Sequence, residues 1–332
     1  MNKVQIEARR RSGSLCAQRA LAHFGVDYEA PVDVFAAIER ERVWLMFQPL
    51  DKLYGAYQRG DTPGIVLHAG HPVRLQRFTA AHELGHHLLG HDISVDSHKE
   101  VERESFGSLP PQEIEAQAFA GTFLMPVQLI NRALGHLGLP RKPGEIEPQH
   151  AYRISLELGS SYAATVTQLR ALERISATNA SNLLRVQPID IKTQLALGER
   201  PANTRADVWP VSIHDNGREL WVGVDDEIHA LLPETPTTGY RWRPLPDSDA
   251  VQIAGDQPIR DGDDTNYGTK RERHVWWRTQ RPAETGIAAN LLRSFDEQAS
   301  TPEESFEITL HIVPQLTGES GQGVSRRQLQ LL

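Results

Sequence analysis

The run HELGH at residues 82–86 constrains the fold of this chain more than any other segment. A helix turns about 100° per residue, so His82 and His86 lie on one helical face, where a single metal ion can bind both. Glu83 follows His82 by about a quarter-turn and can act as general base toward a water molecule at that metal. The run therefore predicts a buried helix that presents a metal site to a neighbouring element.

The residues around the run favour this interpretation over a chance HExxH pattern on a surface helix. Two groups flank the histidines: the small residues Ala80, Ala81 and Gly85, and the apolar residues Phe78, Leu84 and Leu88. Small side chains let another element approach the metal closely, and an apolar stripe buries one face of the helix. A surface helix needs neither feature.

The metal expected at this pattern is Zn²⁺, which in catalytic sites takes three protein ligands and keeps a fourth position open. His91 has the wrong register for the third ligand. Gly90 and His91 follow His86 by four and five residues, whereas HExxHxxGxxH requires three and six. On a continuous helix His87 points about 100° and His91 about 140° away from His86, so we expect them to cap the helix, face solvent or hydrogen-bond a ligand.

A downstream helical segment, QEIEAQAFAGTFLMP, offers a better third ligand in Glu113. Glu113 shares a helical face with Ala116, Gln117 and Ala120. The side chains on this face are small except at its polar ends. The segment can therefore pack against the HELGH helix and direct one carboxylate at the metal, while Gln117 orients a ligand histidine. Glu115 is the competitor, on a bulkier face, and Glu113 also stabilises the N-terminus of its own helix.

The remaining sequence divides into a mainly helical first half and a second half of short strands. We expect helices over 7–24, 32–41, 74–91, 111–124, 152–159 and 161–175, with a small antiparallel sheet from 42–50, 54–59 and 64–70. Further on we expect a hairpin over 208–224, turned at Asn216 and Gly217, and strands at 229–234, 240–245, 273–279, 287–292 and 306–313. The predicted fold class is α+β, with a first domain over 1–185, a linker over 186–206, an all-β sandwich over 207–314 and a disordered tail over 315–332.

The first half resembles the ImmA/IrrE family of bacterial metallo-endopeptidases. The resemblance rests on FTAAHELGHHLLGH and EIEAQAFAGTFLMP and extends over roughly residues 15–180. It implies a zincin-like fold, zinc ligation by His82, His86 and Glu113, and a catalytic Glu83. Gln117 departs from the asparagine or aspartate that is usual in the family. The resemblance also implies a repressor-type transcriptional regulator, encoded nearby, as the protein that is cleaved or controlled.

Charge and composition weigh against nucleic-acid and membrane functions. The net charge of -8 argues against non-specific nucleic-acid binding. YRISLELGSSYAATVTQLRAL has the outline of a helix-turn-helix, but few side chains before Gln168 and Arg170 could read bases, so we expect no direct DNA binding. No stretch reaches the roughly 18 to 20 apolar residues of a membrane span, no secretory signal opens the chain, and the single Cys16 cannot form an internal disulfide. We therefore expect a cytoplasmic protein.

The second half resembles chagasin-like inhibitors of papain-type cysteine peptidases. TPTTGYRW (235–242) is similar to their NPTTGYxW loop, and LLRSF (291–295) stands where they carry an Arg-Pro-Trp-like motif. The resemblance covers roughly 207–314 and implies an immunoglobulin-like sandwich. Thr235 replaces the family's asparagine, and GTKRERHVW lacks the glycine pair that would let the backbone approach a peptidase. We therefore favour recruitment of a protein partner through a loop of Pro236, Thr237, Thr238, Gly239 and Tyr240.

The function expected from these patterns is a zinc-dependent endopeptidase with a partner-binding β domain. Two alternatives stay open: a non-catalytic zinc-binding regulatory protein and a cysteine-peptidase inhibitor. The sequence does not choose an oxyanion-stabilising side chain among His150, Tyr152 and Tyr162.

Overall fold

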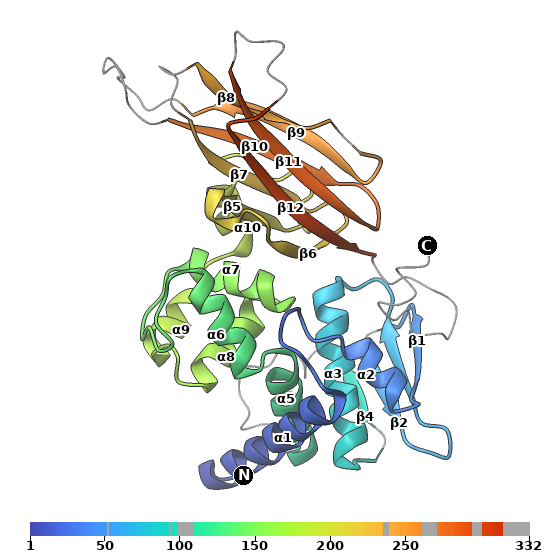
Figure 1. Ribbon diagram of the computed structural model, residues 1–332. Coiled ribbons are helices and arrows are strands. Elements are labelled where there is room, and N and C mark those ends of the chain that lie inside the picture. Colours follow the sequence, from blue (N-terminus) through green and yellow to red (C-terminus); the bar gives the residue numbers. More distant parts are fainter. Residues whose placement is uncertain are drawn as a thin grey trace. The chain divides into compact units, whose positions relative to one another are not determined.

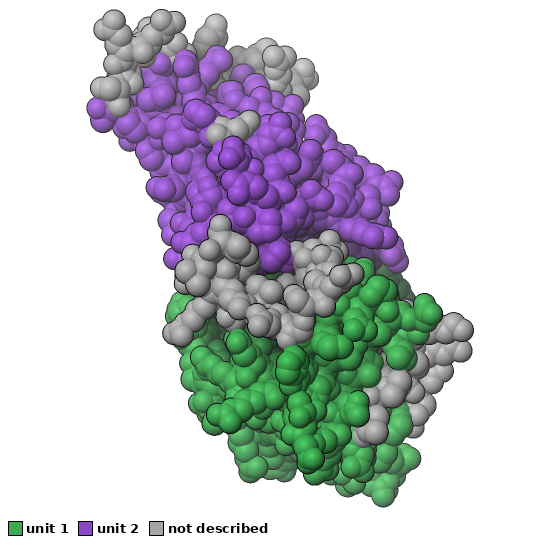
Figure 2. Space-filling view, turned by 90° about the vertical axis from the view of Figure 1, so that its right-hand side faces the viewer, with its two compact units in different colours: residues 1–185, 315–332 green, residues 186–314 purple. Residues whose placement is uncertain are grey.

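The computed structural model describes residues 1–51, 53–92, 94–97, 109–234, 239–246, 248–259, 271–293 and 301–314. These residues form two compact units, unit 1 over 1–185 and unit 2 over 186–314 (Figure 1). Figure 2 shows the surface of each unit in its own colour. No helix in the described ranges is long and apolar enough to cross a membrane.

Unit 1 contains a four-stranded sheet of order β1-β3-β2-β4. Its strands are β1 (Trp44–Gln48), β2 (Leu53–Gln58), β3 (Gly64–His68) and β4 (Ser94–Ser97). Strand β2 pairs antiparallel with both β3 and β4, but β1 pairs parallel with β3. The prediction of a small antiparallel sheet is therefore confirmed for β2 and β3 and wrong for β1. Because β2 reverses the chain between β1 and β3, those two strands run in the same direction and become parallel once they pair.

Helix α5 (Pro111–Leu124) lies at the centre of the helical part, packed against α1 (Lys3–Phe24), α3 (Val73–Leu89) and α8 (Tyr162–Ala171). Its bounds are those predicted, because Pro111 occupies the first turn and Pro126 follows the end of the helix. The core along α5 is apolar and fully buried, with Ile114, Phe119, Phe123 and Leu124 at 0% exposure. This packing brings α5 and the HELGH helix α3 side by side.

The other helices of unit 1 are α2 (Val34–Arg40), α6 (Val127–His136), α7 (Pro148–Leu158) and α9 (Ala177–Leu183). Helix α2 begins after Asp33, whose carboxylate accepts a hydrogen bond from the Ala36 amide at 3.0 Å. The helix therefore starts two residues later than the predicted range of 32–41, and Pro31 lies before it. Helix α7 ends at Gly159 in the left-handed conformation, and the Ser161 hydroxyl caps α8.

Unit 2 is a sandwich of two four-stranded sheets. One has the order β5-β7-β10-β9 and the other β6-β12-β11-β8. The first sheet contains β5 (Val208–Ser212), β7 (Glu227–Glu234), β10 (Arg271–Thr279) and β9 (Val251–Pro258). The second contains β6 (Glu219–Gly223), β12 (Glu304–Val313), β11 (Ala283–Arg293) and β8 (Tyr240–Pro244). Trp242, Phe306 and Ile308 are completely buried, so the apolar faces form one core and the fold class is the predicted α+β.

The hairpin predicted over 208–224 is absent, because β5 and β6 belong to different sheets. The Asp215 carboxylate accepts hydrogen bonds from the Ser212 amide and hydroxyl, which turns the chain after β5. Asn216 then bonds the backbone of Ser305 and Glu307, which directs the following strand toward β12. Strand β9 was not predicted.

The segment expected to be a linker contains helix α10 (Pro188–Leu195), which packs against β5. Lys192 of α10 is 6% exposed. Its Nζ donates to the Ala206 carbonyl at 2.6 Å and lies 3.5 Å from the Asp207 carboxylate. Helix α10 is thus part of the compact second unit.

Candidate metal centre

Three polar atoms converge between α3 and α5. The Nε2 atoms of His82 and His86 are 3.0 Å apart, and Glu113 Oε2 lies 3.0 Å from the first and 3.5 Å from the second. His82 is 3% exposed and His86 is fully buried. Within the described ranges, this is a group of histidine and carboxylate side chains that could hold a metal ion.

The spacing of these atoms fits a tetrahedral zinc ion. Nitrogen and oxygen ligands bind Zn²⁺ at about 2.0–2.1 Å, which separates two ligand atoms at tetrahedral positions by about 3.3 Å. The observed separations of 3.0 to 3.5 Å lie around that value. Two imidazole nitrogens and one carboxylate oxygen are also a ligand set found at catalytic zinc.

The helix sequences explain why the two elements come so close. A Cβ atom at Gly85 would lie 3.0 Å from the Phe119 ring, so only glycine allows this approach of α3 to α5 without a shift. Ala116 and Ala120 on α5 are completely buried. Small residues at the contact therefore bring the first turn of α5, with Glu113, to the histidines.

The charge state of Glu113 also suits a ligand. Burial raises the pKa of this carboxyl group, but its contacts with His82 and His86 outweigh burial and hold the pKa well below its usual range. Glu113 is therefore an ionised carboxylate at neutral pH.

Glu83 is completely buried on α3, next to the first of the two histidines. Burial of a carboxylate at 0% exposure costs free energy unless the group is paired, hydrogen-bonded or close to a metal ion, and the position of Glu83 beside the candidate metal centre fits the last case. Its position in the helix is the one that a general base occupies in the HExxH pattern.

His91 lies behind His86, on the side away from Glu113. Helix α3 ends at Leu89, and Gly90 adopts a left-handed φ of 69°, so the chain folds back over the helix end. His91 Nδ1 is thereby 2.9 Å from His86 Nδ1, and His91 Nε2 is 3.0 Å from Glu115 Oε2. We predicted from the sequence that Gln117 orients a ligand histidine. In the structure His91 makes this contact, and Gln117 is half-buried.

His87 takes a different direction from His86. Its Nδ1 lies 3.1 Å from the Tyr57 hydroxyl of β2, and burial lowers its pKa. Two of the side chains considered for oxyanion stabilisation have other partners: His150 Nδ1 accepts a hydrogen bond from the Glu147 amide, and the Tyr162 hydroxyl donates to the Leu183 carbonyl.

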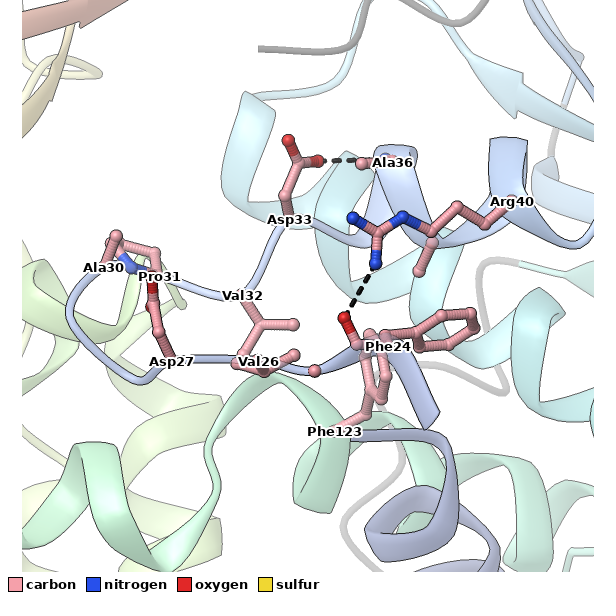
Figure 3. A pocket seen from close by; sticks show the side chains of 12 residues that line it. Phe24, Val26, Asp27, Ala30, Pro31, Val32, Asp33, Ala36, Arg40 and Phe123 are labelled. Carbon is pink, nitrogen blue, oxygen red and sulfur yellow. Dashed lines mark hydrogen bonds between the residues drawn. The ribbon is translucent and has the colours of Figure 1, made fainter. Parts of the chain in front are cut away.

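A separate pocket of about 190 Å³ lies between the end of α1, α2 and the last turn of α5 (Figure 3). Its walls include Phe24, Val26, Val32 and Phe123. Arg40 points toward this pocket, but its Nη1 donates to the Phe24 carbonyl at 2.7 Å. The arginine therefore fixes the connection between α1 and α2.

The loop expected to bind a partner lies only partly in the described ranges, since Pro236, Thr237 and Thr238 fall outside them. Gly239 has a left-handed φ of 76°. The Tyr240 hydroxyl accepts a hydrogen bond from Arg293 Nε at 2.9 Å, and the guanidinium lies 5.0 Å from the centre of the tyrosine ring. Tyr240 and Arg293 thus join β8 to β11 at the base of this loop.

Comparison with known proteins confirms both resemblances. Residues 38–159 match the peptidase family described as the IrrE N-terminal-like domain, and residues 222–310 match the chagasin family of peptidase inhibitors. No curated protein matches the chain. The first match, with the three-residue group described above, supports a metallopeptidase-like role. The second supports protein–protein interaction.

Three solved structures, among others, are similar to about a third of this chain. The cysteine protease inhibitor EhICP2 from Entamoeba histolytica is 18% identical over 32% of this chain and 96% of that chain, with a TM-score of 0.29. Amebosin is 17% identical over 32% of this chain and 98% of that chain, with a TM-score of 0.27. PbICP-C, solved in complex with falcipain-2, is 12% identical over 33% of this chain and 92% of that chain, with a TM-score of 0.22.

Proposed function

We propose that residues 1–185 are a zinc-dependent endopeptidase domain that cleaves a regulatory protein. The observation that carries the proposal is the convergence of His82, His86 and Glu113 at spacings of 3.0 to 3.5 Å. The match of residues 38–159 to a peptidase family supports it. A repressor-type transcriptional regulator encoded nearby is the proposed substrate.

The roles of the side chains follow from their positions and chemistry. The two imidazoles and the ionised Glu113 would hold the metal. Bound zinc supplies Lewis acidity, which polarises a peptide carbonyl and lowers the pKa of water toward about 7. The Glu83 carboxylate would accept a proton from the attacking water and donate it to the leaving amine. Burial of this carboxylate keeps bulk water from competing for that proton.

The test separates metal binding from catalysis with two variants. Glu83→Gln keeps the shape of the side chain but removes the base, so we expect about one zinc per chain and loss of cleavage by at least about a hundredfold. Glu113→Ala removes a ligand, so we expect zinc to be lost or bound much more weakly. Zinc content is measured by elemental analysis, and cleavage by incubation with regulators encoded beside the gene.

Glu39→Gln is the matched control, because Glu39 is an exposed carboxylate on α2 outside the candidate site. It should keep both zinc and cleavage. Equal processing of the regulator by wild type and Glu83→Gln would rule out the enzymatic proposal and leave a non-catalytic zinc protein.

For residues 207–314 we propose a protein-binding module that recruits a partner through its 235–240 loop. The chagasin-family match over 222–310 supports binding of a protein and also makes inhibition of a papain-type peptidase a specific second candidate. Titration of papain with the full chain distinguishes them. Inhibition lost in Tyr240→Ala would establish the inhibitor function, and no inhibition would leave recruitment.

A further inference from the structure

A continuous row of polar contacts leads away from the candidate metal centre and ends on α1. It runs from His86 Nδ1 to His91 Nδ1 at 2.9 Å and from His91 Nε2 to Glu115 Oε2 at 3.0 Å. It ends where Arg9 Nη1 donates to Glu115 Oε1 at 3.1 Å. His91 is 8% exposed and Glu115 is 6% exposed, so the middle of the row is shielded from water.

For a neutral His91, the chemistry of the end groups places every proton in this row. Arg9 can only donate, and an ionised Glu115 can only accept. Glu115 therefore accepts from His91 Nε2–H, which leaves a lone pair on Nδ1 of neutral His91. That nitrogen can only accept from the neighbouring ring, so His86 carries its proton on Nδ1. His86 Nε2 then carries its lone pair on the side of His82 and Glu113.

We infer that His91, Glu115 and Arg9 are positioning residues that fix the tautomer and ring orientation of His86 for metal binding. The inference rests on the metal centre of the proposed function. A histidine whose second nitrogen donates to a fixed acceptor is held in the correct tautomer and is a better ligand. Here the acceptor is another imidazole, itself held by a buried carboxylate.

Local structure places each member of the row. The left-handed Gly90 returns the chain toward the helix, and Arg59 Nη1 holds the Gly90 carbonyl at 2.9 Å. A Cβ atom at Gly13 would overlap the Glu115 carbonyl oxygen, so glycine there lets α1 touch α5 at this residue. Arg9 is one turn before Gly13 and therefore reaches the same carboxylate.

The experiment measures zinc affinity by competition with a chromophoric chelator, using the full-length chain. His91→Leu removes the acceptor of His86 and should weaken zinc binding by about 10- to 100-fold. The absorption bands of bound Co²⁺ should also shift, because the ligand ring is no longer held in one orientation. The matched control is His87→Leu, since His87 follows His86 directly but contacts Tyr57, and its zinc affinity should stay within about twofold of wild type.

Glu115→Gln is the second variant and keeps the proposal testable if His91→Leu does not fold. It removes the charge that orients His91 and should weaken zinc binding by about tenfold. Because both residues act through one row, the double variant should bind zinc no more weakly than His91→Leu alone.

The possible failures differ from one another. If wild type binds zinc and Glu113→Ala does not, equal zinc affinity and an unchanged Co²⁺ spectrum in His91→Leu would overturn the positioning role alone. If wild type itself binds no zinc, the proposed function fails and the positioning role fails with it.

Discussion

Two histidines are buried against each other in unit 2, far from the candidate metal centre in the sequence. His229 Nδ1 lies 2.9 Å from His274 Nε2, and Trp276 stacks on both rings. Burial, and to a smaller extent the charge of the neighbouring His229, lower the pKa of His274 to about 4. His274 is therefore neutral in the native protein over most of the acidic range.

This pKa predicts a loss of stability on acidification. The unfolded chain protonates His274 near pH 6.5, whereas the native protein does so only near pH 4, so the unfolded state binds more protons between these values. The free energy of unfolding of unit 2 should fall as the pH drops from about 6.5 to about 4, by on the order of 3 kcal/mol from this residue. Urea unfolding followed by tryptophan fluorescence measures it, since five of the six tryptophans lie in unit 2.

The variant His274→Gln should flatten this pH dependence, because the group that titrates has been removed. Other charged groups around the pair are Glu227, whose Oε2 is 3.2 Å from His229, and Arg278, which binds the same glutamate. The pKa of Glu227 is lowered to about 2, so its own contribution is lost mainly below the window of His274. His214→Gln, at an exposed histidine, is the control. An unchanged slope in His274→Gln would disprove the assignment.

Residue spacing alone predicted the candidate ligands and left contact with a ligand as one of three roles for His91, but it did not predict Glu115 or Arg9 behind them. The period of a helix was enough to predict His82 and His86 as ligands. Glu113 was predicted from a second helix that carries small residues on one face. Glu115 and His91 lie 24 positions apart, and they meet because Gly90 reverses the chain and Gly13 allows α1 to touch α5. A sequence pattern that assumes a continuous helix places His91 on the wrong side of His86.

At the scale of elements, the contact between α1 and α5 supports the site from behind. Thr122 Oγ1 on α5 donates to Ser14 Oγ on α1 at 3.0 Å, next to the close approach of Gly13 to Glu115. The two helices therefore meet backbone against backbone at Gly13 and Glu115, and side chain against side chain at Ser14 and Thr122.

We predict that Gly13→Ala destabilises unit 1 by about 2 kcal/mol, the upper end of the net cost, because the overlapping atom belongs to the backbone. Alanine favours a helix by about 1 kcal/mol over glycine, but its Cβ would overlap a backbone oxygen of α5, and overpacking of this kind costs typically 1–3 kcal/mol and occasionally more. The control is Gly135→Ala in α6, where a Cβ atom meets nothing within 4 Å and stability should rise by about 0.5–1 kcal/mol. Urea unfolding monitored by helical circular dichroism compares them, and a Gly13→Ala protein as stable as Gly135→Ala would contradict the packing argument.

Elements with strong local signals were predicted well, and those decided by distant partners were not. Helix α5 carries a proline at each boundary. Strand β9 contains Gly255, Asp256 and Pro258, residues that are rare in strands, and it pairs along β10, where the Trp276 ring lies over Gly255. The turn after β5 has the Asn-Gly sequence of a hairpin, but hydrogen bonds from Asn216 to β12 decide which sheet the next strand joins.

At the scale of the whole molecule, the segment 186–206 determines where a fragment that contains the second unit should begin. Helix α10 was expected to be linker because LALGERPANT, which follows it, has no periodicity. In the structure Lys192 extends from α10 to the start of β5, where Asp207 and Asp226 lie together. Burial and the charge of Asp207 raise the pKa of Asp226 to about 6. Lys192 contributes a positive charge 3.5 Å from the Asp207 carboxylate of this acidic pair.

We predict that a fragment of residues 186–332 is more stable than one of residues 200–332 by about 3 kcal/mol. The shorter fragment lacks α10, so Asp207 loses its contact with Lys192 and β5 loses a packed neighbour. Removal of one member of a buried ion pair costs about 3–5 kcal/mol, and the lower end applies because Asp207 is half-buried. Lys192→Met in the longer fragment separates the two effects, because it keeps the apolar stem and removes the charge. Urea midpoints followed by tryptophan fluorescence should fall in the order 186–332, Lys192→Met and 200–332. Identical midpoints for the two fragments would show that α10 is only a connection between the units.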